Sequence, residues 1–186
     1  MEQLGSLPWA RAHSSLFLAA KVILFFELTK FFGKKMTPEQ YFQRIKAQKE
    51  QLRHLYGRVL PVKIGNEAVL FTRDNFRKEG FVDDSLVPWR PSKRKSDPKH
   101  PDRAYNTLMS RRNNLYKSIQ KRTQPGVAII YTNVPYAAAH NEGTRNAGRG
   151  HKVVIPKRQF IGPSKTFDAK AKQIVEDELK RVLNNK

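Results

Sequence analysis

The segment Leu115-Tyr-Lys-Ser-Ile-Gln-Lys-Arg-Thr-Gln-Pro-Gly-Val-Ala-Ile-Ile-Tyr-Thr-Asn133 carries the clearest strand pattern in the chain. Residues 115–121 alternate with the two-residue period of a strand, and residues 127–133 are mostly β-branched or aromatic. Between them, Gln124-Pro125-Gly126 is typical of a turn. The sequence therefore predicts a β-hairpin at the core of the domain, with its first strand starting near Leu115.

Two helices are predicted on the N-terminal side of this hairpin. Apolar side chains recur at helical spacing in residues 38–57, and Thr37-Pro38-Glu39-Gln40 has the pattern of a capping box with proline at the first helical position. After Leu60-Pro61, a second helix is predicted over residues 62–79, ended by Gly80.

The remaining segments are predicted to be loops, one strand and a final helix. Residues 81–103 contain four prolines and a basic run, which indicates an exposed loop. Residues 140–151 are glycine-rich and predict a flexible excursion, residues 153–155 have strand character, and an amphipathic helix starts near Thr166. The predicted fold class is α+β: a small antiparallel β-sheet packed by N-terminal helices and a C-terminal helix, with long basic and Gly-rich loops.

Residues 1–35 differ from the rest of the chain, because they hold five of the eleven Phe residues. Membrane insertion of Leu16–Phe32 is marginal since Lys21, Glu27 and Lys30 interrupt it, and Lys21 also splits the apolar core that a signal peptide needs. We therefore interpret residues 1–35 as an apolar N-terminal extension. It is either a helix that packs on the domain or a neighbouring subunit, or an upstream extension of a chain starting at Met36. Residues 36–186 form the predicted domain.

Composition restricts the chemistry. The chain has 186 residues, 36 Lys or Arg against 16 Asp or Glu, and a formal net charge of +20. It contains no cysteine, which excludes disulfides, thiolate nucleophiles and Cys-ligated metal centres. A surface this basic attracts polyanions, either nucleic acid or acidic protein faces.

The basic charge is concentrated in residues 88–124, which contain eleven Lys or Arg and two acids. Such density favours contact with phosphate, and the alternative is a solvated loop that steers the protein to an acidic partner. Tyr105 and Tyr116 could stack on bases or belong to the core. The residues predicted to face DNA are Arg90, Lys93, Arg94, Lys95, Lys99 and Arg103.

The sequence evidence for a metal site or a phosphate-binding loop is weak. His140, Glu142 and His151 are residue types that bind divalent metals, but their spacing matches no metal motif and they flank or lie in a glycine-rich segment. The glycines there do not have the spacing of a phosphate-binding loop. We predict no catalytic residue, no metal site and no cofactor.

Three pieces of sequence, in order, resemble the phage virion morphogenesis family, which includes Mu-like minor virion proteins and tail-completion proteins. They are Asn75-Phe-Arg-Lys-Glu-Gly-Phe81 with Pro88-Trp89, Val134-Pro-Tyr-Ala-Ala-Ala-His-Asn-Glu-Gly143, and Ile155-Pro-Lys-Arg-Gln-Phe-Ile-Gly-Pro-Ser164. The second is similar to the family's Tyr-Ala-x-x-His-x-x-Gly and the third to its Pro-x-Arg-x-Phe-x-Gly-x-Ser. The chain departs from the family before the first strand, where residues 108–119 lack the usual glycine.

The resemblance implies a structural, non-enzymatic virion protein of the neck or tail end, involved in head-tail joining or tail completion and assembled as a ring. Its partners would be further copies of itself, other neck, tail or connector proteins, and genomic DNA in the channel; we expect no membrane partner. Its location would be the virion, and the host cytoplasm during assembly. Phe160 would be buried and Arg158 paired to a carboxylate or carbonyl, fixing the turn before the last helix. The residues predicted to anchor loops or contact subunits are Trp89, Tyr136, His140, Asn141, Glu142, Gly143, Arg158 and Phe160.

Two alternatives stay open from sequence. The first is a monomeric basic nucleic-acid-binding protein, which the charge favours. The second is a metal-dependent nuclease using His140 or Glu142, which would need further ligands on a rigid element.

Overall fold

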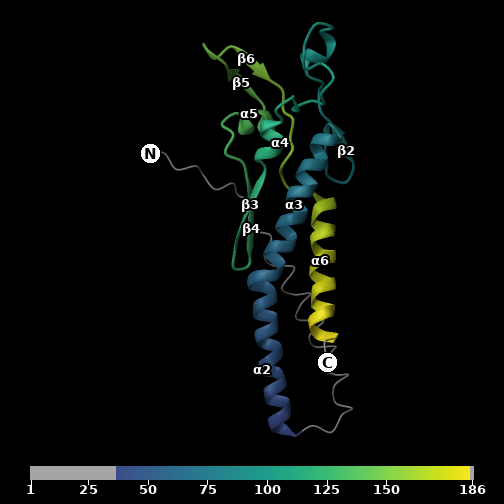
Figure 1. Cartoon of the computed structure of the whole chain (residues 1–186), viewed down its shortest axis with the longest axis vertical. Coiled ribbons are helices and arrows are strands. Elements are labelled where there is room, and N and C mark those ends of the chain that lie inside the picture. The colour runs from purple at the N-terminus through teal and green to yellow at the C-terminus, as the bar shows by residue number, and fades with distance from the viewer. Residues whose placement is uncertain (1–36, 185–186) are drawn as a thin grey trace.

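A computed structural model describes residues 37–184, and a long helical rod runs through it (Figure 1). The rod consists of α2 (Pro38–His54), the π-helical turn η3 (Leu55–Val59) and α3 (Leu60–Arg77). The predicted capping box is confirmed: the Gln40 backbone N–H donates to Thr37 Oγ1 at 3.3 Å, and the Thr37 N–H donates to Gln40 Oε1 at 3.1 Å. The predicted apolar extension, residues 1–35, lies outside the described residues.

The predicted break at Leu60-Pro61 is wrong, because the helix continues through it. The Leu60 backbone N–H donates to the carbonyl of Leu55, the five-residue spacing of a π-turn. Pro61 has no N–H to donate and its ring crowds the preceding turn of an α-helix. The π-turn places Pro61 in the first turn of α3, where the missing donor is tolerated.

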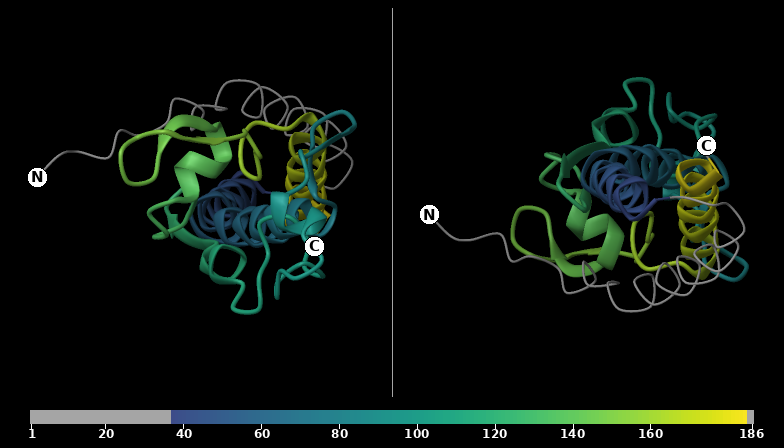
Figure 2. Two further views of the ribbon diagram at one scale, coloured as in Figure 1. Left: turned by 90° about the horizontal axis from the view of Figure 1, so that it is seen from above. Right: turned by 90° about the horizontal axis from the view of Figure 1, so that it is seen from below.

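α3 is covered on two sides by segments distant in sequence. The hairpin of β3 (Gln120–Gln124) and β4 (Val127–Tyr131) packs on one side, and α6 (Lys165–Asn184) packs along the other (Figures 1 and 2). Ion pairs join α3 to α6, from Lys63 to Glu178 at 2.6 Å and from Lys170 to Glu67 at 3.0 Å. The predicted C-terminal helix is therefore confirmed.

Gly65 explains how closely the hairpin approaches the rod. It is buried on α3, and a Cβ there would lie 3.1 Å from Lys121 Cδ and 3.3 Å from Ala128 Cβ. A Cβ at this position would force Lys121 and Ala128 of the hairpin to shift by a few tenths of an ångström. Glycine inside a helix is unfavourable for helix stability. Gly65 is therefore explained by the close packing of the hairpin on α3 and not by helix formation.

The predicted hairpin is confirmed except at its start. The strands pair antiparallel from Gln120 opposite Tyr131 to Gln124 opposite Val127. Residues 114–118, which include the predicted start of the first strand, instead form the short helix α4 (Asn114–Ser118). Leu115 in α4 and Ile119 just after it are both buried, at 3% and 1% exposed, whereas Lys117, which would share their face in a strand, is exposed. The alternation in this stretch is therefore a misleading signal.

Two segments predicted as loops contain short secondary structure. The segment after α3 holds the antiparallel pair β1 (Gly80–Val82) and β2 (Leu86–Pro88) and the 3₁₀ turn η4 (Lys93–Ser96). The glycine-rich excursion is an α-helix followed by a hairpin: α5 (Ala137–Glu142), β5 (Thr144–Ala147) and β6 (Val153–Ile155). Gly148 and Gly150, both at positive φ, lie in the turn that closes this hairpin.

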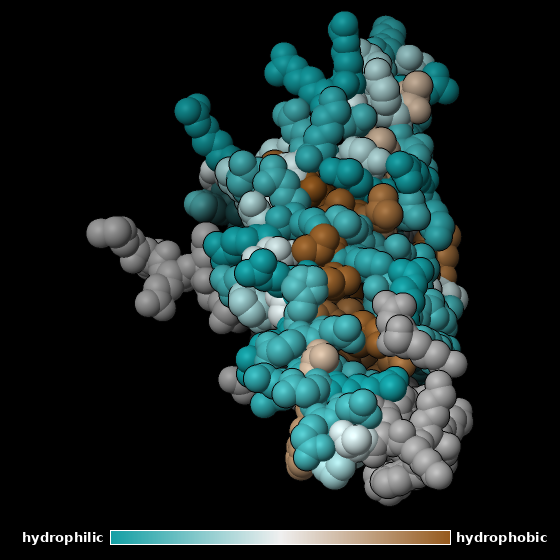
Figure 3. Space-filling view, turned by 60° about the horizontal axis from the view of Figure 1, so that its bottom comes forward, coloured by the Kyte–Doolittle hydropathy of each residue, from teal (hydrophilic) through white to brown (hydrophobic). Residues whose placement is uncertain are grey.

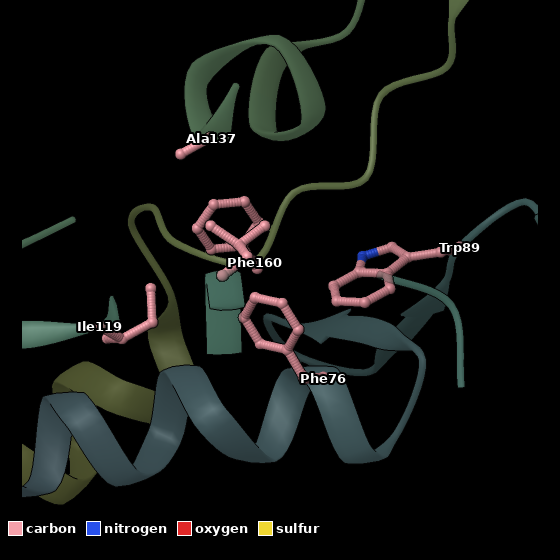
Figure 4. Close-up of a cluster of buried hydrophobic side chains, with 6 residues drawn as sticks. Phe76, Trp89, Ile119, Ala137 and Phe160 are labelled. Atoms are coloured by element: carbon pink, nitrogen blue, oxygen red, sulfur yellow. The ribbon is translucent and has the colours of Figure 1, made fainter. Parts of the chain in front are cut away.

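The α+β class is confirmed, but residues 37–184 contain three separate two-stranded sheets rather than one small sheet. The core lies at one end of α3, where side chains from distant parts of the domain meet (Figure 4). Phe76 is fully buried, with its ring centroid 5.1 Å from that of Phe160, 5.6 Å from that of Trp89 and 5.8 Å from that of Tyr116. Helices in the described part of the chain are too short or too polar to cross a membrane.

Candidate functional site

The segment Pro156–Ser164, here called the signature segment, connects β6 to α6 and passes over the end of α3 beside the aromatic core. It has no regular secondary structure, so its backbone groups need partners from elsewhere in the chain. Those partners come from α3, α5 and the segment after β2.

Two buried asparagines hold the middle of the signature segment. Asn141 Oδ1 on α5 accepts hydrogen bonds from the backbone N–H groups of Phe160 at 3.0 Å and Ile161 at 3.1 Å. Asn75 Nδ2 on α3 donates to the Phe160 carbonyl at 3.1 Å, and Asn75 Oδ1 accepts from the Val82 N–H at 3.2 Å. Both backbone groups of Phe160 are thus satisfied while its ring is 1% exposed.

The other side of the signature segment is tied to the chain after β2. Trp89 Nε1 donates to the Gln159 carbonyl at 2.7 Å. Arg158 Nε donates to the Arg90 carbonyl at 2.8 Å and Arg158 Nη2 to the Pro91 carbonyl at 3.2 Å. Arg158 is 8% exposed, and burial together with the nearby charges of Arg90 and Arg94 lowers its pKa from the usual value.

Ser164 ends the signature segment and starts α6. Its Oγ accepts from the Phe167 N–H at 3.1 Å, capping the helix, and donates to the Val82 carbonyl of β1 at 2.8 Å. Sequence reasoning places Asn75 and Ser164 within motifs but gives neither of them a role. Burial of a polar side chain indicates a structural role, but this burial becomes known only when the structure shows which backbone groups Asn75 and Ser164 bind.

Gly143 and His140 bring α5 against the start of the signature segment. The Arg158 N–H donates to the His140 carbonyl at 2.8 Å. Gly143 has φ +77°, and a Cβ there would lie 2.8 Å from the Lys157 backbone nitrogen. Glycine is thus required for both conformation and space. Tyr136 packs edge-to-face on the His140 ring at 5.9 Å and is 46% exposed.

The metal-binding alternative is not supported by the positions of its residues. Burial and the charge of Arg158 lower the pKa of His140, and the same positive charge disfavours a metal cation beside its ring. His151 Nδ1 lies 3.2 Å from the Asn146 carbonyl, and Glu142 accepts from Asn141 Nδ2 at 2.6 Å. Across residues 37–184, no group of three or more His, Asp or Glu side chains is arranged to hold a metal ion.

The model of the phage virion morphogenesis family matches residues 37–183, which include the whole signature segment and all of its partners. The chain belongs to this family. A second comparison gives a similar protein, the Mu-like prophage FluMu G protein 2 of Haemophilus influenzae, 50% identical over 48 residues. That match covers 26% of this chain and 34% of the relative, so about a third of the relative's length is spanned. No solved structure matches this family member.

The predicted DNA-facing residues of this family member divide into two sets. Arg94 and Lys95 point inward: Arg94 Nη2 donates to the carbonyls of Asn106, at 2.7 Å, and Met109, while Lys95 Nζ lies 2.7 Å from Glu79 Oε1. The other four are exposed residues: Arg90, Lys93, Lys99 and Arg103.

Glu79 is the acid that holds the basic loop, residues 90–103. It lies in the first of the three sequence motifs, but sequence reasoning assigned it no role. Its carboxylate binds Lys95 and also accepts from the Thr107 backbone N–H, while its own carbonyl accepts from the Trp89 N–H at 2.7 Å. Partial burial alone would raise the pKa of Glu79, but the hydrogen bonds from Lys95 and Thr107 outweigh it and hold the pKa below its usual value.

Proposed function

We propose that this chain is a structural protein of the phage neck or tail end, acting in head-tail joining or tail completion and assembling as a ring. The observation that carries the proposal is the family match across residues 37–183, which takes in the entire described fold except its final residue. The described part of the chain is held together by buried hydrogen bonds and an aromatic core, which suits a structural component. The proposed role is non-enzymatic.

Helix α2 supports self-assembly. None of its residues is buried, although apolar side chains follow one another along it. Tyr41 is 36% exposed, Phe42 is 68% exposed and Ile45 is 39% exposed. Figure 3 shows apolar side chains gathered in a band over the middle of one face of the molecule. An apolar helix surface that its own domain leaves open is typical of a subunit contact.

The location is tested with purified virions. Mass spectrometry should detect this chain in the particles, and cryo-electron microscopy should show a ring of this fold at the head-tail junction or tail end. Absence from virions, with the chain present only in infected cells, would contradict the proposal and favour an assembly factor.

The ring is tested by native mass spectrometry of the purified full chain. Phe42→Ser should shift the population from oligomer to monomer, because it removes the most exposed of these apolar side chains on α2. Leu70→Ser is the matched control, since Leu70 is 52% exposed on α3. A monomeric wild-type chain at assembly concentrations would remove support for the ring.

A monomeric nucleic-acid-binding protein is the second candidate, and the exposed positions of Arg90, Lys93, Lys99 and Arg103 favour it. This candidate predicts a monomer whose DNA affinity falls steeply with salt. The ring proposal predicts a defined oligomer found in virions. The two experiments above therefore separate the candidates.

A further inference from the structure

The β5–β6 hairpin carries a second concentration of basic charge, outside the basic loop. Its turn region, residues 145–152, contains Arg145, Arg149 and Lys152, all of them exposed residues, together with His151. The hairpin, residues 143–155, contains no Asp or Glu. Three cations without an acid on a narrow protruding hairpin create a local positive potential.

This hairpin and the basic loop, residues 90–103, occupy the same end of the molecule. In Figure 1 both extend beyond the upper end of α3, at the opposite end of the rod from the start of α2. Figure 2, looking along the rod, shows the two excursions on different sides of its axis. They therefore form two separated basic arms rather than one continuous patch.

The two acids of the basic loop accept hydrogen bonds from backbone N–H groups. Asp97 Oδ1 accepts from the Lys99 N–H at 3.0 Å, and Asp102 Oδ1 accepts from the Arg111 N–H at 3.4 Å. With Arg94 and Lys95 bonded inward, these contacts order the loop while leaving Arg90, Lys93, Lys99 and Arg103 at its surface.

We propose that the β5–β6 hairpin and the basic loop together bind the phosphate backbone of duplex DNA, one arm on each side of the contact. The proposal rests on the proposed function for the presence of DNA beside the protein. Contacts from Arg and Lys to phosphates position a duplex without reading its sequence, so the binding is sequence-independent.

The composition of the hairpin turn favours DNA over an acidic protein. Among residues 145–152 the apolar content is limited to Ala147 and the glycines, and the large exposed apolar side chains of the hairpin are confined to Val153 and Val154 on β6. The centres of protein interfaces are instead enriched in aromatic and other large apolar side chains. Gly148 and Gly150 carry no side chain, so the backbone of the turn between Arg145 and Lys152 can approach a phosphate closely.

The test measures binding of the full chain to a fluorescein-labelled 30-base-pair duplex by anisotropy over a range of salt concentrations. The hairpin variant Arg145→Gln/Arg149→Gln/Lys152→Gln is compared with the matched control Arg58→Gln/Lys172→Gln/Lys180→Gln, which removes the same charge from exposed positions on η3 and α6. Circular dichroism checks that each variant is folded.

We expect the hairpin variant to lower the salt slope by about 1 for each phosphate that it no longer neutralises, and to weaken binding by at least about tenfold at low salt. The control should change the slope by much less. Equal effects of the two variants would show that only total charge matters and would overturn the proposal. Failure of the wild-type chain to bind the duplex at low salt would overturn it as well.

Two further measurements distinguish the arms from an acidic-protein contact and from the proposed function. Polyglutamate should displace the duplex poorly; displacement as effective as that by unlabelled duplex would overturn the proposal in favour of an acidic protein partner. Virion incorporation of the chain is measured in parallel. Absence from virions with hairpin-dependent DNA binding would contradict the proposed function but support the arms, whereas incorporation with no such binding would overturn the arms alone.

Discussion

Asn141 binds the backbone of Phe160 through its side-chain oxygen, 3.0 Å from the Phe160 nitrogen, although the two residues lie 19 positions apart. This contact joins the end of α5 to the segment that starts α6. It places the Phe160 ring against Phe76 at the end of α3. Two separate sequence motifs therefore act as one structural unit.

Replacing Asn141 by Leu should destabilise the domain strongly. The change leaves the N–H groups of Phe160 and Ile161 buried without an acceptor, and each such group costs about 1–3 kcal/mol. Urea unfolding followed by circular dichroism measures the loss. Asn66→Ala, at an exposed position on α3, is the control and should stay within about 0.5 kcal/mol of wild type. Equal stabilities of the two variants would refute the role of Asn141.

Two substitutions of Trp89 should distinguish the contribution of its packing from that of its hydrogen bond. Trp89→Phe keeps a ring against Phe76 but removes the donor to the Gln159 carbonyl, so we expect a loss of about 1–3 kcal/mol. Trp89→Ala also empties part of the core and should cost about 3–5 kcal/mol. Chemical denaturation of both variants checks the order. A Phe variant as damaged as the Ala variant would contradict the packing role.

Gly143 and Gly150 form a matched pair, since both have positive φ but differ in surroundings. An alanine at Gly143 would meet the Lys157 backbone at 2.8 Å, whereas nothing lies within 4 Å of a Cβ at Gly150. Gly150→Ala should therefore show only the backbone strain of about 1 kcal/mol, and Gly143→Ala clearly more. Melting temperatures report the difference, and equal shifts would argue against the close approach.

Glu79 should make the free energy of unfolding depend on pH. Its pKa in the folded chain lies below the usual value, so its contribution is complete above the unfolded pKa, near 4.5, and is lost as pH falls through the folded pKa. Glu79→Gln should be less stable than wild type at neutral pH, with the gap narrowing below about pH 4. Urea midpoints across pH 3–7 test this. A gap that does not change with pH would mean that the ionised carboxylate contributes nothing.

The predicted domain boundary at Met36 can be tested directly. A chain that starts at Met36 retains the Thr37 capping box and every contact described above. We expect it to unfold cooperatively, with a urea midpoint close to that of the full chain. A large loss of stability would place part of the domain within residues 1–35.

Local patterns were sufficient for the elements whose signals come from neighbouring residues. The Thr37 cap, the helix that follows it, the Gln124-Pro125-Gly126 turn and the C-terminal helix depend on spacing and capping within a few residues. The same reasoning failed at Pro61, because a π-turn relieves the proline without changing the pattern of apolar side chains. It also failed at Leu115, since a short stretch can fit both a strand and a single helical turn.

The partners of the polar side chains depended on tertiary structure. Arg94 and Lys95 stand in the same basic run as Lys93 and Lys99, yet only folding turns the first two inward, toward backbone carbonyls and Glu79. Arg158 likewise binds two carbonyls 67 and 68 positions away. A buried polar group must find a partner wherever the fold supplies one, and hydrogen bonds over such distances leave no periodic trace in the sequence. Periodicity therefore indicated the helices and the hairpin, and only the folded chain decided which charges hold the domain together and which remain for a partner.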